Sequence, residues 1–239
     1  MTRVTEALRA VGVGLGLAIV AIFGSFALVL GASRALALGG VSVRGDPELR
    51  IALSLLLVQG VTFGGISLLY LRLRGREYVR VRVPTVNDGK WMLGGVLAML
   101  AAMFAVVSIL GALGIHSAQN EVVRLGVDDP RVFLLLIPCA FLIIGPGEEL
   151  LFRGVIQSRL RDAFSPAIAI GLASAIFASA HALSLVGAFQ ARVATIASLF
   201  VVSLVLGIAY ERTENLAVNA FIHGCYDASL FLLAYLAIR

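Results

Sequence analysis

Charged residues are scarce in this chain of 239 residues. Asp, Glu, Lys and Arg together make up 14% of it, whereas a soluble globular domain is about one quarter charged. Hydrophobic residues make up 60%, and the mean hydropathy is +0.99. This balance excludes an ordinary soluble domain and indicates a membrane protein. The sequence also lacks internal repeats, low-complexity tracts and long linkers, so we expect a single integral membrane domain over residues 1–239.

Cysteine is rare as well. The two cysteines, Cys139 and Cys225, both lie inside long apolar runs, and we expect no disulfide bond between them. Cys225 stands between His223 and Asp227, but on a helix it points roughly 160–200° away from those two side chains. We therefore interpret both cysteines as small apolar packing residues.

What the chain has in abundance is apolar runs long enough to cross a bilayer, which takes about 20 residues. Backbone N–H and C=O groups in lipid must pair within their own segment, so these runs are expected to be helices. The predicted fold class is therefore all-α, a polytopic transmembrane helical bundle. The seven expected spans cover about residues 11–33, 51–71, 91–113, 132–155, 166–188, 193–210 and 215–237.

The basic residues favour an N-terminus in the cytoplasm. With this orientation 12 Lys and Arg residues fall on the cytoplasmic side and 7 on the opposite side, as the positive-inside rule requires. The densest basic block, from Arg72 to Lys90, then anchors the chain at the anionic leaflet. The net charge of +5 therefore indicates a membrane and not nucleic acid. The first apolar run follows Arg3 and Arg9 like that of a signal peptide, but it exceeds the usual 7–15 residues, so we expect an uncleaved helix.

The ionisable residues inside the apolar runs are the strongest functional signal. Such a group at bilayer depth costs at least a few kcal/mol and marks a functional site by default. Glu148 and Glu149 follow Gly145-Pro146-Gly147, a sequence that can kink a membrane helix or open its backbone. Glu149 and Arg153 stand four residues apart and suit an ion pair, which leaves Glu148, about 100° round the helix, free for other work. The alternative is that both glutamates merely pair with arginines near the interface.

Further polar residues lie on two later spans. His181 ends the run Phe177-Ala178-Ser179-Ala180-His181, and alone it is equally compatible with a satisfied core histidine. His223 and Asp227 stand four apart on one helical face, which Asn219 extends by one turn. An imidazole oriented by a carboxylate suits acid–base chemistry or metal binding, although a helix-packing hydrogen bond is the alternative. Two His, two Glu and one Asp together favour a hydrolytic site.

These residues resemble the motifs of the CPBP family of intramembrane proteases (CAAX protease and bacteriocin-processing, also called Abi). The run EELLFRG from Glu148 to Gly154 is similar to the EExxxR motif of the family, and Phe177 to His181 is similar to its FxxxH motif. His223 to Asp227 resembles the third motif, HxxxN or a close variant. The motifs occur in the family's order and cover roughly residues 130–237, the catalytic core of the family. The helices within residues 1–115 carry no such motif.

The resemblance implies a CAAX-prenyl-protease-like hydrolase in the cell membrane. Such an intramembrane endopeptidase would cleave a membrane-associated peptide or protein near the cytoplasmic face, and the resemblance leaves open whether the substrate is prenylated. It implies that Glu148 acts as general base on a water and that His181 helps to hold this water. His223 and Asp227 would stabilise the oxyanion of the tetrahedral intermediate. The implied partners are this substrate and the lipid bilayer, with no nucleic acid.

Other residues have supporting roles in this interpretation. The resemblance implies that Glu149 and Arg153 fix the architecture of the site. Phe177, which opens the second motif, and Asn219, which shares the helical face of the third motif, are expected to support it.

Residue 227 departs from the family pattern. The commoner residue is Asn, whose amide donates to an oxyanion, whereas Asp227 donates only when protonated. An ionised Asp227 would instead orient His223 or bind a metal. We expect hydrolysis without a metal or other cofactor, and a zinc site on Glu148, His181, His223 and Asp227 stays open as the alternative.

The depth of the polar residues in the bilayer constrains the fourth span. If this span ended near Val155, Glu148 would lie about 10 Å from its end and could not meet His181, about 22 Å from the start of the next span. If the span continues to about Asp162, Glu148 lies about 21 Å from its cytoplasmic end. This depth brings Glu148 within reach of His181. We therefore expect a long fourth helix whose lower part, from Arg153 to Arg161, faces a wet cavity open to the cytoplasm.

Two other functions would use the same residues. A non-catalytic member of the family would act as an immunity factor or membrane scaffold, but the complete set of Glu148, His181 and His223 argues against this. A proton-coupled transporter also needs titratable groups at depth, but no inverted repeat or pair of broken helices appears. An endopeptidase is therefore the leading hypothesis.

Overall fold

The structure is a computed structural model that describes residues 2–75 and 78–238, without the side chains of residues 119–121. Two residues of the charge count above, Arg76 and Arg239, lie outside this part. The chain is 86% helical, and the all-α prediction is confirmed. Seven helical stretches of the described part are long and apolar enough to span a membrane, so the chain is a multi-pass integral membrane protein. These stretches are Arg3–Leu38, Pro47–Arg74, Val86–Ala112, Arg131–Arg161, Pro166–Leu183, Phe189–Thr213 and Leu216–Ile238.

Several of the spans consist of more than one helical segment. The elements follow one another as α1 (Arg3–Leu38), η1 (Val43–Gly45), α2 (Pro47–Ser54), η2 (Leu55–Gly64), α3 (Gly65–Arg74), α4 (Val86–Ala112), β1 (Gln119–Asn120), α5 (Glu121–Asp128), α6 (Arg131–Cys139), η4 (Ala140–Ile144), α7 (Gly145–Glu149), η5 (Leu150–Gln157), α8 (Ser158–Arg161), α9 (Pro166–Ala180), η6 (His181–Leu183), β2 (Leu185–Val186), α10 (Phe189–Thr213) and α11 (Leu216–Ile238). Segments η2, η4 and η5 are π-helical, whereas η1 and η6 are single 3-10 turns.

The fifth span is shorter than predicted. Its expected range was 166–188, but α9 ends at Ala180 and η6 ends at Leu183. The chain then becomes extended, and β2 pairs antiparallel with β1. Gly187 follows with φ of +140°, a backbone conformation that glycine adopts far more readily than other residues. The helix therefore stops before the apolar run does.

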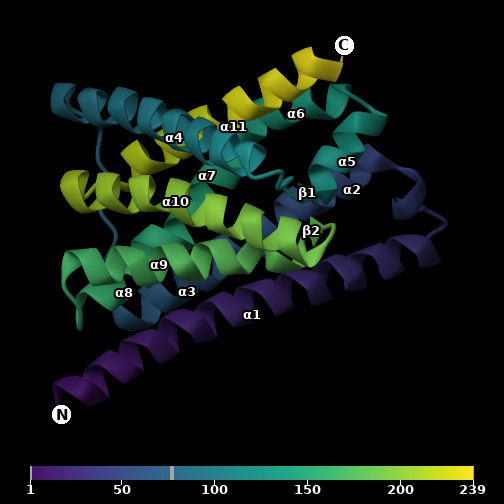
Figure 1. Cartoon of the computed structure of the whole chain (residues 1–239). Helices are drawn as coiled ribbons and strands as arrows, with labels where there is room; N and C mark the ends of the chain where they lie inside the picture. The colour runs from purple at the N-terminus through teal and green to yellow at the C-terminus, as the bar shows by residue number, and fades with distance from the viewer. Residues whose placement is uncertain (1, 76–77, 239) are drawn as a thin grey trace.

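The described loops gather at two ends of the bundle. In Figure 1 the N-terminus, α8 and the connection from α3 to α4 lie at one end, whereas β1 and β2 lie toward the other. Loops that the sequence assigns to the cytoplasm therefore share one end. The cytoplasmic assignment itself follows from the positive-inside rule alone and stays a prediction.

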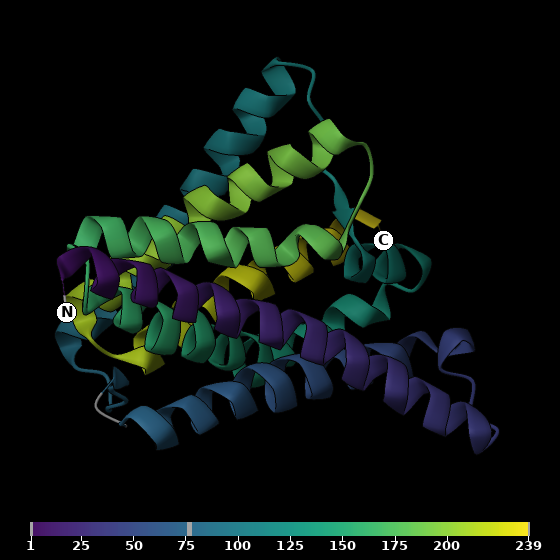
Figure 2. The same cartoon turned by 90° about the horizontal axis from the view of Figure 1, so that it is seen from below.

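Helix α1 packs along the bundle through small residues. Its buried positions recur every three or four residues and form one stripe: Ala10, Gly14, Ala18, Ala21 and Ser25. Small side chains let helix backbones approach closely in a membrane. Helix α1 crosses the bundle obliquely (Figure 1), and the second view shows it between α9 on one side and the α2–η2–α3 stretch on the other (Figure 2).

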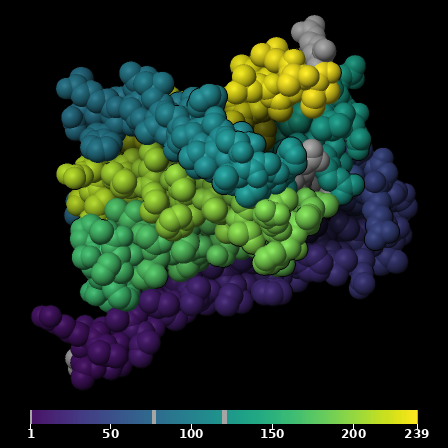
Figure 3. All heavy atoms as spheres, viewed as in Figure 1, coloured from purple at the N-terminus to yellow at the C-terminus, as the bar shows by residue number. Residues whose placement is uncertain are grey.

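Two large apolar clusters fill much of the bundle. The first joins α1, η2, η5 and α9 and includes Phe63, Phe152 and Phe177. The second joins α4, α10 and α11 and includes Leu206 and Ile222. The space-filling view shows α4 and α11 on the side opposite α1 (Figure 3). The fourth span contacts α9, α10 and α11, so its polar residues lie between the two clusters.

The fourth span runs without interruption from Arg131 to Arg161, which confirms the prediction of a long fourth helix. The run Gly145-Pro146-Gly147 does not break it. Instead, the π-helical segments η4 and η5 flank α7 and widen the turns on either side. A Cβ atom at Gly145 would lie 2.7 Å from the carbonyl oxygen of Ala220 on α11, so glycine lets these two helices meet backbone to backbone.

A polar network holds the end of the bundle that carries α8. Thr85 and Asp88 form a capping box at the start of α4, which satisfies two helix N–H groups. Arg82 bonds to Asp88 at 2.6 Å and to the carbonyl oxygen of Thr213 at 3.0 Å. Asn215 in turn bonds to the backbone of Arg82. The segment before α4 is therefore tied to the junction of α10 and α11.

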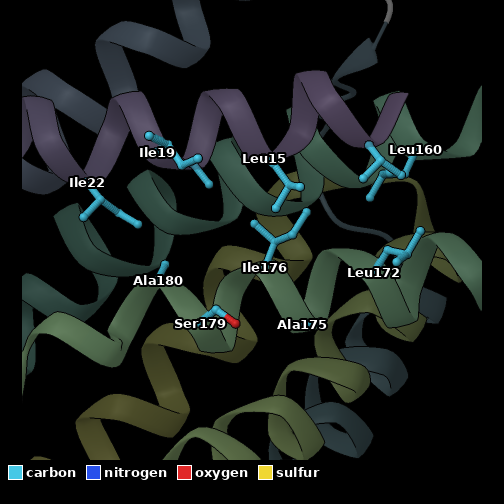
Figure 4. Close-up of a pocket in the computed structure, with 11 residues that line it drawn as sticks. Leu15, Ile19, Ile22, Leu160, Leu172, Ala175, Ile176, Ser179 and Ala180 are labelled. Atoms are coloured by element: carbon cyan, nitrogen blue, oxygen red, sulfur yellow. The ribbon is translucent and has the colours of Figure 1, made fainter. Parts of the chain in front are cut away.

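An apolar groove lies between α1 and α9 (Figure 4). It encloses about 390 Å³, and apart from Ser179 its lining side chains are apolar. It is lined at one end by Ala180, the residue before His181. The groove therefore runs along α9, the helix whose C-cap is the candidate site residue His181.

Candidate active site

Glu149 and Arg153 form the ion pair expected from their spacing. Arg153 Nη1 lies 2.6 Å from Glu149 Oε1, and the two side chains are 2% and 0% exposed. Arg153 Nη2 donates to the hydroxyl of Ser203 on α10 at 2.8 Å. The guanidinium carbon lies 4.6 Å from the ring centroid of Phe177 on α9. This pair therefore joins the fourth, fifth and sixth spans.

Glu149 also reaches the seventh span. Its Oε1 accepts a hydrogen bond from His223 Nδ1 at 2.8 Å, and its Oε2 accepts one from Asn219 Nδ2 at 3.0 Å. The Asn219 amide also donates to the carbonyl oxygen of Leu206 at 2.8 Å. Three side chains, counting Arg153, thus donate to one buried carboxylate, and such pairing is what a buried charge requires. Both oxygens of Glu149 are occupied.

His223 turns its other nitrogen toward two further carboxylates. Since a carboxylate only accepts hydrogen bonds, the bond to Glu149 places a proton on Nδ1. Nε2 lies 3.5 Å from Asp227 Oδ2 and 3.8 Å from Glu148 Oε2. The His223 side chain is 6% exposed and that of Asp227 is 17% exposed. Nε2 therefore faces a small polar space that Glu148 and Asp227 border.

Glu148 is nearly buried, and its bonds differ from those of Glu149. Its side chain is 8% exposed, and its Oε1 accepts a hydrogen bond from Gln59 Nε2 on η2 at 2.7 Å. Arg153 bonds to Glu149 and Ser203 instead. The second oxygen of Glu148 meets His223 only across 3.8 Å, which is beyond a hydrogen bond. Glu148 thus keeps one oxygen available.

His181 lies at the end of α9, where it caps the helix. Its Nδ1 lies 2.9 Å from the carbonyl oxygen of Phe177, which only accepts, so this nitrogen carries a proton and Nε2 is left for another partner. The Phe177 ring has its centroid 4.8 Å from that of His181 and 6.1 Å from that of His223. His181 also lies within electrostatic range of Asp227.

The structure therefore brings the predicted residues together from three spans, the fourth, the fifth and the seventh. Glu148, Glu149, His223 and Asp227 lie in direct contact or within 3.8 Å of a neighbour. His181 lies beside them across the Phe177 ring, and Arg153 and Asn219 surround Glu149.

The expectation that the lower part of the fourth span, from Arg153 to Arg161, faces a wet cavity is wrong for Arg153. Arg153 does not face a wet cavity, because it is only 1% exposed and donates to Glu149 and α10. A polar cavity of about 280 Å³ lies toward the end of the span, and Gln157, Ser158, Arg161 and Asp162 line part of it. Arg153 is buried because Glu149 neutralises its charge and Ser203 accepts a further hydrogen bond from it, which offsets the cost of removing the guanidinium from water.

Sequence reasoning missed Gln59. The second span carries no ionisable residue at this depth, so the pattern of charged residues does not indicate that it contributes to the site. The signal was nevertheless present, since an amide within the apolar run of η2 (Leu55–Gly64) must find a hydrogen-bonding partner in the membrane. Its partner is Glu148.

Metal binding can be judged from the positions of the possible ligands. In residues 2–75 and 78–238, no group of three or more His, Cys, Asp and Glu side chains is placed to hold a metal ion. The alternative zinc set of Glu148, His181, His223 and Asp227 is included in this result. Both cysteines, Cys139 and Cys225, are free.

A comparison with protein families matches residues 130–229 to the model described as type II CAAX prenyl endopeptidase Rce1-like. The resemblance to the CPBP family is thereby confirmed over this segment, which contains all four candidate catalytic residues. The family is one of membrane-embedded proteases, so protease activity is supported at the level of the family. Comparisons with curated proteins and with solved structures give no match.

Proposed function

We propose, on the premise that residues 130–229 are Rce1-like, that this chain is an intramembrane endopeptidase of the CAAX-processing type. In this proposal Glu148 activates the water that attacks a peptide bond of a membrane-associated protein or peptide. The observation that carries the proposal is the contrast between the two adjacent glutamates. Glu149 has both oxygens bonded to side chains of the bundle, whereas Glu148 has one oxygen held by Gln59 and one that faces His223.

The chemistry needs a base of this kind. The Glu148 carboxylate takes a proton from water, and the resulting hydroxide adds to the carbonyl carbon of the scissile bond. The C=O bond becomes a C–O⁻ single bond in the tetrahedral intermediate. When this intermediate collapses, the C–N bond breaks and the protonated Glu148 returns its proton to the leaving nitrogen. General acid–base catalysis of this type contributes about 10²–10⁴-fold.

The histidines have separate tasks in this proposal. His181 Nε2, left free by the bond from Nδ1 to Phe177, accepts a hydrogen bond from the water and helps to hold it. His223 in its doubly protonated form presents the Nε2 N–H to the oxyanion, and Asp227 adds a second donor when it carries a proton. Donors fixed in a dry site lower the barrier by a few kcal/mol.

The substrate class is supported by the surroundings of the site. The apolar groove between α1 and α9 reaches Ala180, directly before His181. A substrate with a lipid attached would find apolar surface there while its peptide bond lies at the polar residues. We therefore propose a membrane-associated substrate, with prenylated CAAX peptides as the first class to test.

The test is the cleavage of peptides by purified protein in proteoliposomes. A panel of prenylated and unprenylated CAAX-type peptides is followed by mass spectrometry for new chain ends. We expect cleavage by wild type and a loss of about 10²–10⁴-fold in Glu148→Gln, because the amide keeps the shape but cannot accept the proton. Folding should be retained, as judged by melting temperature.

The matched control is Glu211→Gln. Glu211 pairs with Arg161 at 2.9 Å near the end of the bundle, far along the fourth span from Glu148, and its loss should leave the cleavage rate nearly unchanged. Near-normal cleavage by Glu148→Gln would assign the base to another residue. The absence of cleavage by wild type across the panel would instead favour the scaffold or transporter alternatives.

A further inference from the structure

Gln59 is a polar residue of the candidate site that lies outside the three motifs. We propose that Gln59 is a positioning residue whose side-chain amide holds the Glu148 carboxylate with one oxygen turned toward His223. The inference rests on the proposed function, because Gln59 acts on the reaction only through Glu148. It also brings the second span, outside the Rce1-like segment, into the site.

The contact is direct, and chemistry fixes its donor. Gln59 Nε2 lies 2.7 Å from Glu148 Oε1, the length of a charge-assisted N–H···O⁻ bond. A carboxylate that is ionised only accepts hydrogen bonds, so the amide must turn its NH2 group toward it. The reverse assignment would set two acceptors against each other. Oε1 of Glu148 is therefore held by a directional side-chain donor.

Gln59 also decides which carboxylate oxygen is free. The last torsion of a glutamate side chain is broad, so an unheld carboxylate would exchange its two oxygens. With Oε1 bonded to Gln59, Oε2 is the oxygen that lies 3.8 Å from His223 Nε2. The base is thereby aimed at the space that the histidine borders.

The backbone around Gln59 is shaped for this contact. Segment η2 is π-helical over ten residues, and π-helical turns occur frequently at functional sites. A Cβ atom on Gly147 would lie 2.7 Å from the carbonyl oxygen of Gln59, so a larger residue would push the helices apart. The rings of Phe63 and Phe152 meet edge to face at 5.8 Å between the same two spans. Close packing therefore sets the distance that the hydrogen bond needs.

The carbonyl oxygen of the Gln59 side chain supports the same interpretation. Gln59 Oε1 is buried and has no hydrogen-bond partner within the described part of the chain. An unpaired buried acceptor is unfavourable, and Leu or Met would fill the same volume without it. The bond to Glu148 is the feature of Gln59 that an apolar residue cannot supply.

Carbodiimide labelling tests the inference without a substrate. Dicyclohexylcarbodiimide reacts with protonated carboxyl groups in apolar surroundings, and mass spectrometry of the peptide 132–153 separates adducts on Glu148 from those on Glu149. In Gln59→Met we expect the pH of half-maximal labelling at Glu148 to rise by about one to two pH units, because the carboxylate loses a charge-assisted donor. Glu149, held by Arg153 in both proteins, should label as in wild type.

Two further variants serve as a control and as a substitute for Gln59→Met. Thr62 lies in the same π-helical segment and donates to the carbonyl oxygen of Leu57, so Thr62→Val removes a hydrogen bond of η2 without touching Glu148 and should leave the labelling unchanged. Gln59→Glu keeps the length and polarity of the side chain in case Gln59→Met folds poorly. Two adjoining carboxyl groups cannot both ionise freely, so labelling at Glu148 should again move to higher pH.

Peptidase assays on the same preparations separate this inference from the proposed function. In an active enzyme, the acid limb of the kcat/KM profile of Gln59→Met should move to higher pH by the same interval, with a fall in kcat. Unchanged labelling at Glu148 in both Gln59 variants would overturn the inference even if wild type cleaves peptides. If Gln59→Met shifts the labelling of Glu148 but the wild-type protein cleaves no peptide, the result would support the contact and overturn the proposed function.

Discussion

Replacing Arg153 by Met tests how the bundle holds charge in its interior. The change keeps most of the side-chain length and removes the guanidinium that pairs with Glu149. The carboxylate would then remain buried with donors from His223 and Asn219 but without its cation. We expect the protein to fold with reduced stability.

The magnitude follows from the burial of the pair. Removing one partner of a buried ion pair costs about 3–5 kcal/mol, because the other charge stays desolvated. The lost contact with the Phe177 ring and the lost hydrogen bond to Ser203 act on the same guanidinium, so we do not add them. In a chain of this size about 1 kcal/mol shifts the melting temperature by roughly 2–4 °C. The melting temperature of Arg153→Met should therefore fall by about 6–20 °C.

The assay is thermal unfolding in nanodiscs, with Arg80→Met as the matched control. Arg80 also pairs with a glutamate, Glu214, but their side chains are 69% and 62% exposed, and such pairs contribute about 0–1 kcal/mol. A melting temperature of Arg153→Met within about 2 °C of wild type would refute the reasoning, since it would show that the buried pair contributes no more than an exposed one.

The remaining predictions concern residue 227 and the glycines. If the site works without metal, Asp227→Asn should retain or increase cleavage and activity should survive chelators, because Asn supplies an oxyanion donor. Loss of both zinc and activity in this variant, by metal analysis beside the assay, would identify Asp227 as a ligand, whereas lost activity with unchanged metal content would mean that it orients His223. Gly147→Ala should destabilise the protein by about 1–3 kcal/mol, because its Cβ would meet the Gln59 backbone at 2.7 Å. Gly95→Ala should cost less in the same unfolding assay, because its Cβ would meet the movable side-chain end of Ile222.

Much of the architecture could be predicted from length and periodicity. Seven apolar runs of spanning length give seven membrane helices, because the bilayer leaves the backbone no other way to pair. The long fourth helix followed from the depths of Glu148 and His181, and the buried ion pair followed from the four-residue spacing of Glu149 and Arg153. These inferences succeeded because each depends on helix geometry alone.

The failures concern contacts between helices. The burial of Arg153 depends on Ser203 and Phe177, which lie on helices that the sequence does not place beside it. The partner of Gln59 stands 89 residues away in the chain, and a single amide in an apolar run does not indicate where it points. The pairing of β1 with β2 involves two residues on each side, too few for any periodic pattern.

The small-residue stripe of α1 has a consequence for the membrane around the protein. With 36 residues this helix is about 54 Å long, whereas the hydrocarbon core of a typical bilayer is about 30 Å thick. A helix of this length fits a bilayer by tilting and by extending its ends into the headgroups, and Figure 1 shows α1 oblique to α9 and α10. Gly14 of the stripe lets α1 approach the side chains of Ile156 and Ile176, so a change of tilt reaches α9, the helix whose C-cap is His181. We therefore expect hydrophobic mismatch, and with it the acyl-chain length of the surrounding lipids, to shift a helix that borders the candidate site.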